Sequence, residues 1–129
     1  MFIVKKTLFA QSIIIDKKSN LVTACNIIEE FITPVIPTHL APTNLLIYFE
    51  RDSIIGDSKF NVKVTTSLND KLLGETNTPI DFQTRKKHRL VVGYNTIPIN
   101  ELGVLKFKIF NEKGKLLHTH ECSISPTTI

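Results

Sequence analysis

The stretch Leu90–Phe110, LVVGYNTIPINELGVLKFKIF, decides the fold class of this chain, because it holds two strand patterns separated by turn residues. In its second half Leu105, Phe107 and Ile109 alternate with lysines. A period of two with charge on one side is typical of a half-buried strand. The run Leu90–Val92 is apolar at every position, which predicts a strand inside its sheet with both faces covered. The stretch therefore predicts two strands of a β-sheet core, joined by a crossing segment.

The rest of the chain shows the same alternation in short runs separated by turn residues. The expected strands are 2–15 and 21–32 as a hairpin, 44–50, 60–65, 105–110 and 115 to about 123. The hairpin pattern blurs at 26–30, which indicates either a β-bulge or a short helical turn. Three prolines between residues 34 and 42 predict an extended link between sheets, and the polar run 77–87 predicts a loop or an edge strand.

These short strands, with turn signals every 8–12 residues or so, predict an all-β fold. No segment keeps a 3.6-residue period for three turns. The expected architecture is a single antiparallel β-sandwich of about seven to nine strands, immunoglobulin-like or C2-like, spanning residues 1–129 as one domain. A chain of 129 residues is long enough to bury about two-thirds of its unfolded surface without staples.

The order of these segments also carries a resemblance. The residues concerned are Ala10–Ser12, a short basic turn, Leu21–Ile32, the proline-punctuated link, Leu45–Phe49 and the closing hairpin Val104–Ile124. In this order and pattern the chain resembles a family of small uncharacterised bacterial β-sandwich domains of unknown function. One departure is that the first turn, Lys17–Asn20, has no glycine. The resemblance implies the fold and no activity.

Composition favours a soluble protein of a reducing compartment. The charged share is 22% and the net charge is +4, which permits an anionic partner but is far from a polybasic surface. Two cysteines are too few for a disulfide framework. Charges at 16–18 interrupt the apolar run ahead of Cys25, which argues against a lipoprotein signal, and no run reaches the ~18 apolar residues of a membrane span. We therefore expect a cytoplasmic protein that does not bind membranes.

The row His118, His120 and Cys122 is the candidate metal site. Residues two apart share one face of a strand, and imidazole with thiolate suits zinc, with Cys25 as a candidate fourth ligand. The favoured alternative is a core-facing row with a buried thiol and histidines toward its rim, because the apolar neighbours at 116 and 124 share its parity. The expectation is therefore no bound cofactor.

The one run of positive charge is the candidate site for an anionic ligand. Its members are Arg85, Lys86, Lys87 and Arg89, and the lysines that could extend it into a phosphate-facing surface are Lys5, Lys6, Lys17 and Lys18. The sequence shows neither a recognition helix nor a series of exposed aromatics for stacking on bases. The favoured interpretation is a solvated loop whose charges protect a strand edge from aggregation.

Catalysis is not expected, because the only local pairing of a nucleophile with a base is His120 with Cys122. The sequence has no nucleophile elbow, phosphate-cradling loop or dinucleotide fingerprint. The favoured function is a non-catalytic module that binds another protein through a sheet face, a sheet edge or a loop end, with homo-oligomers through sheet edges as one form. The alternative is an accessory protein that binds nucleic acid or another anionic ligand through Arg85–Arg89.

Overall fold

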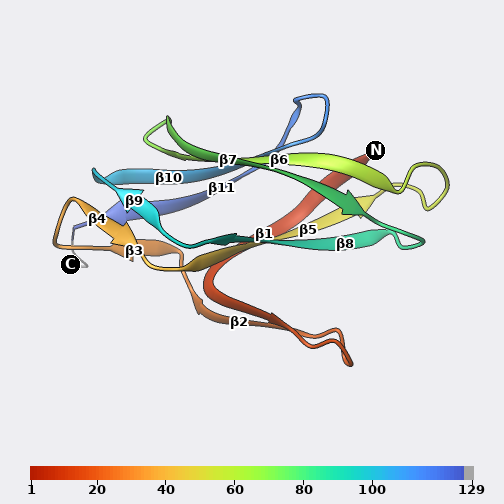
Figure 1. Cartoon of the computed structure of the whole chain (residues 1–129), viewed down its shortest axis with the longest axis horizontal. Helices are drawn as coiled ribbons and strands as arrows, with labels where there is room; N and C mark the ends of the chain where they lie inside the picture. Colours follow the sequence, from red (N-terminus) through yellow and green to blue (C-terminus); the bar gives the residue numbers. More distant parts are fainter. Residues whose placement is uncertain (127–129) are drawn as a thin grey trace.

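The computed structural model describes residues 1–126, and all its regular elements are strands, as the sequence predicted (Figure 1). Sheet A has the order β2-β1-β5-β8 and sheet B the order β3-β11-β10-β6-β7, while β4 and β9 form a separate pair, sheet C. The strands are β1 (Phe2–Ile15), β2 (Val22–Ile27), β3 (Glu30–Ile32), β4 (Thr38–Leu40), β5 (Thr43–Arg51), β6 (Lys59–Leu68), β7 (Lys71–Asp81), β8 (Lys87–Tyr94), β9 (Ile97–Ile99), β10 (Gly103–Phe110) and β11 (Leu116–Ser125). The described residues contain no helix that is long and apolar enough to cross a membrane.

The predicted hairpins are present, and local backbone chemistry sets their turns. β1 with β2, β6 with β7 and β10 with β11 pair antiparallel. Asn69 and Asp70, between β6 and β7, have φ of 50° and 67°, and a two-residue turn with two left-handed residues matches the right-handed twist of its strands. Gly114 supplies a φ of 81° to the turn after β10. The strand pair β3 and β11 is parallel.

One apolar core lies between sheets A and B. Leu105, Phe107 and Ile109 of β10 have no exposed surface, so the alternation predicted from the sequence is confirmed. Sheet A contributes Phe9, whose ring centroid lies 4.7 Å from that of Phe107. The odd-numbered side chains of β5 also face this core, since alternate residues of a strand point to one side.

The apolar run Leu90–Val92 lies elsewhere than the sequence predicted. It belongs to β8, which is the last strand of sheet A and pairs only with β5. Val91, on the outer face, is 36% exposed, while Val92 is buried. The prediction of an interior strand was therefore wrong, because an apolar run specifies neither how many strands lie beside it nor whether both of its faces are covered. The strand expected at 44–50 is β5, which lies inside sheet A between β1 and β8; its odd-numbered side chains are buried, while Asn44, Tyr48 and Glu50 on the outer face are partly exposed.

β1 is long enough to serve two purposes. Residues 2–10 pair with β5, and residues 10–15 pair with β2. Residues 11–27 therefore form a hairpin arm that extends below sheet A and turns back beneath it in Figure 1. The single strand expected over 21–32 was wrong in its extent: it is broken after Ile27 into β2 of sheet A and β3 of sheet B. A left-handed Asn26 with φ of 56° precedes the break, and the pairing of β1 with β2 shows no register shift that would mark a bulge. The polar run predicted as loop or edge contains the end of β7, the last strand of sheet B, with Pro79 in it.

The proline-rich link connects β3 of sheet B to β5 of sheet A, as predicted. It contains the short strand β4, which pairs with β9, and the peptide bond between Ile36 and Pro37 is cis. Three strands, β3, β4 and β9, have three residues each. These short strands bring the described chain to eleven strands, above the expected range of about seven to nine.

Candidate anion-binding groove

A groove of about 1110 Å³ lies between the outer face of sheet A and the hairpin arm. Its walls come from segments far apart in the sequence: β1, the tip of the arm, β5, the end of β7 and the turn leading into β8. Two of its side chains are acidic, Glu50 and Asp81. Six are cationic, namely Lys5, Lys6, Arg85, Lys86, Lys87 and Arg89. We call this hollow the basic groove.

Strand register places the cations side by side. Tyr48 of β5 stands opposite Lys6 of β1 on one side and Arg89 of β8 on the other, so one row crosses the outer face of sheet A. Glu50 stands opposite Lys87 in the next row of the same face. A register shift between Val4 and Lys6 leaves the side chains of both Lys5 and Lys6 exposed. The groove therefore depends on pairing between residues that are more than 35 positions apart in the sequence.

Most of these charges have no carboxylate partner. Lys5 forms an ion pair with Glu50 at 3.5 Å, and within residues 1–126 the other five cations of the basic groove form none. Lys6 lies over the ring of Tyr48, 4.6 Å from its centroid. Arg89 donates hydrogen bonds to the backbone oxygen and to the side-chain oxygen of Asn20, at the tip of the arm. Positive charge collected in a concave site raises the local concentration of anions.

A buried arginine holds the turn that carries the basic run. Arg51, at the end of β5, is 2% exposed. Its guanidinium donates to the backbone oxygens of Arg85 at 2.8 Å and Gln83 at 2.9 Å, and to that of Asp57 at 3.1 Å. It also lies over the ring of Phe82, 5.3 Å from the centroid. Arg51 therefore ties two loops together by satisfying buried backbone acceptors.

The sequence analysis did not identify Arg51, although a signal was present. Arg51 has the same parity as the core-facing residues Leu45, Ile47 and Phe49. That parity places its side chain on the inner face at the end of the strand, where a long arginine can reach backbone carbonyls of the neighbouring loops.

The basic run itself divides between two faces. His88 faces inward, and its ring centroid lies 5.8 Å from that of Phe82. Burial lowers the pKa of His88, and the charge of Asp81 opposes that shift. Lys87 and Arg89 lie on the outer face and line the groove. Of the lysines that the sequence analysis added to the run, Lys5 and Lys6 also line it.

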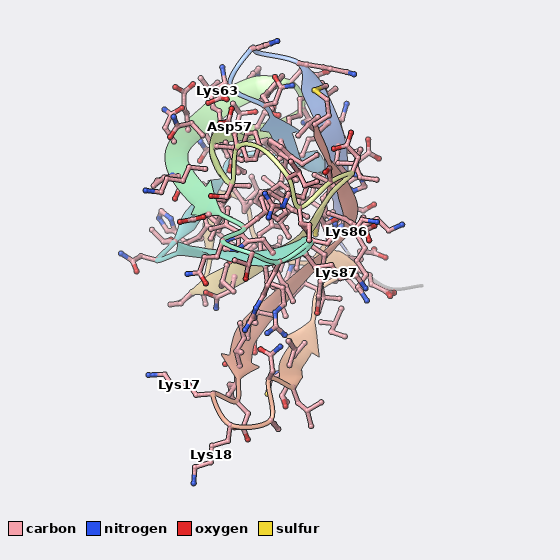
Figure 2. The ribbon with its side chains drawn as sticks, turned by 90° about the vertical axis from the view of Figure 1, so that its right-hand side faces the viewer. Lys17, Lys18, Asp57, Lys63, Lys86 and Lys87 are labelled. Carbon is pink, nitrogen blue, oxygen red and sulfur yellow. The ribbon has the colours of Figure 1, made fainter. Side chains whose placement is uncertain are left out.

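The other two lysines that the sequence analysis added to the run lie away from the basic groove. Lys17 and Lys18 lie at the tip of the arm and point away from the body of the protein, whereas Lys86 and Lys87 lie close to β8 (Figure 2). Neither Lys17 nor Lys18 lines the groove. The tip is shaped by Asp16, whose carboxylate accepts a hydrogen bond from the Lys18 backbone at 2.8 Å.

The row predicted as a metal site is only partly brought together. His118 and His120 both reach the hydroxyl of Thr7 in sheet A, with Nε2 of His118 at 3.2 Å and Nδ1 of His120 at 2.7 Å. Cys122 lies in the core with no exposed surface, and burial raises the pKa of its thiol to about 11. Cys25 is exposed on β2, and both thiols are free.

Within residues 1–126, no three His, Cys, Asp or Glu side chains are grouped in a way that could hold a metal ion. The two histidines instead bridge the sheets through one hydroxyl, near the edge of the core. A zinc site at His118, His120 and Cys122 stays a prediction.

The sequence matches no protein-family model and no curated protein. The resemblance to small bacterial β-sandwich domains therefore stays a prediction as well. Because function is set by sites rather than by folds, it has to be argued here from the residues of the basic groove.

Proposed function

We propose that this protein binds an anionic ligand in the basic groove. The observation that supports this most directly is that five of the six cations lining one hollow have no carboxylate partner among the described residues. Like charges gathered in this way repel one another, and an anion placed between them relieves the repulsion. Arg89 is also held by Asn20, which reduces the entropy that its side chain loses on binding.

The groove suits a ligand with several anionic groups. A single exposed ion pair contributes about 1 kcal/mol or less, so a useful affinity needs several contacts at once. Lys6 lies over one face of the Tyr48 ring, and the two phenylalanines of the groove, Phe49 and Phe82, are each 1% exposed, so the groove offers little aromatic surface on which a base could stack. We therefore propose recognition of charge along a polyanion, without selection of sequence. Such binding weakens steeply with salt because bound counterions are released.

The test is the binding of a short fluorescent oligothymidylate, followed by anisotropy over a series of salt concentrations. Four contacts to phosphates predict a slope of log K against log salt of about −3. The double variant K87Q/R89Q removes two cations of the groove and should weaken binding about tenfold or more, with a slope shallower by about 1.4.

The matched control is K113Q/K115Q, which removes two exposed lysines near the β10–β11 turn, outside the groove. It should keep the affinity and the slope of the wild type. Equal losses in both double variants would show that binding follows net charge alone, and would contradict the proposal.

The proposal involves no catalysis, and it takes up the alternative that the sequence analysis left beside a protein-binding module. We also propose that sheets A and B form a single β-sandwich of the immunoglobulin-like or C2-like kind, because one apolar core joins them. The two free thiols support a reducing compartment such as the cytoplasm.

A further inference from the structure

Four strands lie at the ends of the two large sheets, and β2 differs from the other three. β8 carries Lys87 and Arg89, β7 carries charged residues and Pro79, and β3 is only three residues long. Charges, prolines and short length are the usual means of preventing an edge from pairing with another chain. β2, with the sequence VTACNI, has no charged residue and no proline. Its edge is the unprotected one of the four.

The free side of β2 presents backbone groups ready for pairing. The amide of Asp16 donates to the oxygen of Leu21 at 2.9 Å, so the carbonyl group of Leu21 points toward β1. Peptide groups alternate in direction along an antiparallel strand, so those of Val22 and Ala24 face away from β1. Apolar side chains surround this edge, since Leu21 is 68% exposed, Ile14 55% and Ile27 54%. None of these three side chains lines the basic groove, so anion binding does not explain why they are exposed.

The charges on either side of β2 indicate what pairs with it. Lys17 and Lys18 lie in the turn before the strand and Glu29 follows it, while Glu30 begins β3, where it pairs with Ser123 of sheet B; all four are exposed. None of the four forms an ion pair within the described part of the chain. If β2 lies antiparallel to a second β2, the lysine end of each copy meets the glutamate end of the other. Opposite charges face each other at both ends, as a two-fold interface requires.

We infer that β2 pairs antiparallel with β2 of a second copy of this chain, so that the two copies of sheet A become one continuous sheet. A parallel arrangement would place lysine against lysine and glutamate against glutamate, which is unfavourable. The neutral strand between these ends lets the two edges approach without repulsion. The small side chains of Thr23, Ala24 and Cys25 add no bulk along the contact.

Sedimentation equilibrium of the wild type and three charge variants tests the inference. The wild type should dimerise reversibly with concentration. The variants K17E/K18E and E29K/E30K place like charges at both ends of the interface, and each should weaken dimerisation about tenfold or more. The combined variant K17E/K18E/E29K/E30K exchanges the two ends and should restore dimerisation to near the wild-type level. A monomeric wild type, or a combined variant as weak as either double variant, would overturn the inference.

Cross-linking locates the interface independently. Cys25 is exposed in the middle of β2, while Cys122 is buried, so a short bismaleimide should join two chains through Cys25. The C25S variant should still dimerise but give no cross-linked product. A wild-type dimer that the reagent does not join would place the interface elsewhere and overturn the inference. None of these residues lines the basic groove, so dimerisation and anion binding are measured separately.

Discussion

Replacing Arg51 with methionine should destabilise the protein severely. The change removes three hydrogen bonds from a charged donor to backbone oxygens, at 2.8, 2.9 and 3.1 Å, and leaves those acceptors in a buried site. At about 1.5 kcal/mol for each bond the loss is about 4.5 kcal/mol, and relief of the desolvation of a buried cation offsets about a third of it. We expect a net loss of about 3 kcal/mol. Methionine is unbranched and apolar, so it can fill much of the space of the arginine stem, although it loses the contact of the guanidinium with the ring of Phe82 together with the hydrogen bonds.

Urea unfolding followed by far-ultraviolet circular dichroism measures this loss, and thermal unfolding should show a fall in Tm of roughly 10 °C for a chain of this size. Arg51→Lys keeps the charge but cannot reach three diverging carbonyls, so it should lie between methionine and the wild type. If Arg51→Met unfolds within about 1 kcal/mol of the wild type, the three hydrogen bonds do not hold the loops together, and this reasoning is refuted.

Further predictions concern the seam between the sheets, a tight turn and the core. Burial and the charge of His118 lower the pKa of His120 below the ordinary 6.5. As the pH falls, the unfolded chain therefore binds a proton at this residue before the folded chain does. The contribution of neutral His120 to the free energy of unfolding should therefore be full above pH 6.5, and it should decline as the pH falls from there through the lowered pKa. In the His120→Gln variant the free energy of unfolding should change less over this pH range. Gly103 has a φ of 141°, and a Cβ there would lie 1.8 Å from the Asn69 side chain. Gly103→Ala should lower Tm well below that of Gly74→Ala, whose added Cβ meets no atom within 4 Å. Phe107→Ala should cost about 3–5 kcal/mol in urea unfolding, and a loss under 1 kcal/mol would place that ring outside the core.

Local patterns predicted most of the strands and the hairpins between consecutive strands, while pairing between strands far apart in the sequence could not be predicted. The alternation around Phe107 and the closing hairpin Val104–Ile124 depend on residues close in sequence, and both were confirmed. The position of Leu90–Val92 at a sheet edge depends on long-range pairing, which an apolar run does not specify. The hairpin arm was predictable as a hairpin, but its position beneath sheet A was not, because β1 pairs with β5 as far as Ala10 and with β2 beyond it.

The same distinction applies to the groove. The run from Arg85 to Arg89 is easily recognised in the sequence. Lys6 lies in the same groove only because β1, β5 and β8 pair in a particular register, which the sequence does not show. Sequence alone grouped Lys17 and Lys18 with these cations, and the structure places both outside the groove. Arg51 was missed because a lone arginine at the end of a strand is usually solvated, although its parity with the apolar residues of β5 indicated an inward side chain.

Mapping of bound anion by nuclear magnetic resonance tests the central claim that the basic groove is a binding site. The protein labelled with ¹⁵N is titrated at low salt with a short oligothymidylate, and the amide shifts are followed residue by residue. The account predicts saturable shifts at Lys6, Tyr48 and residues 85–89, lost when salt is added. Shifts that are absent at low salt, or that centre on the lysines of the β10–β11 turn, would contradict it.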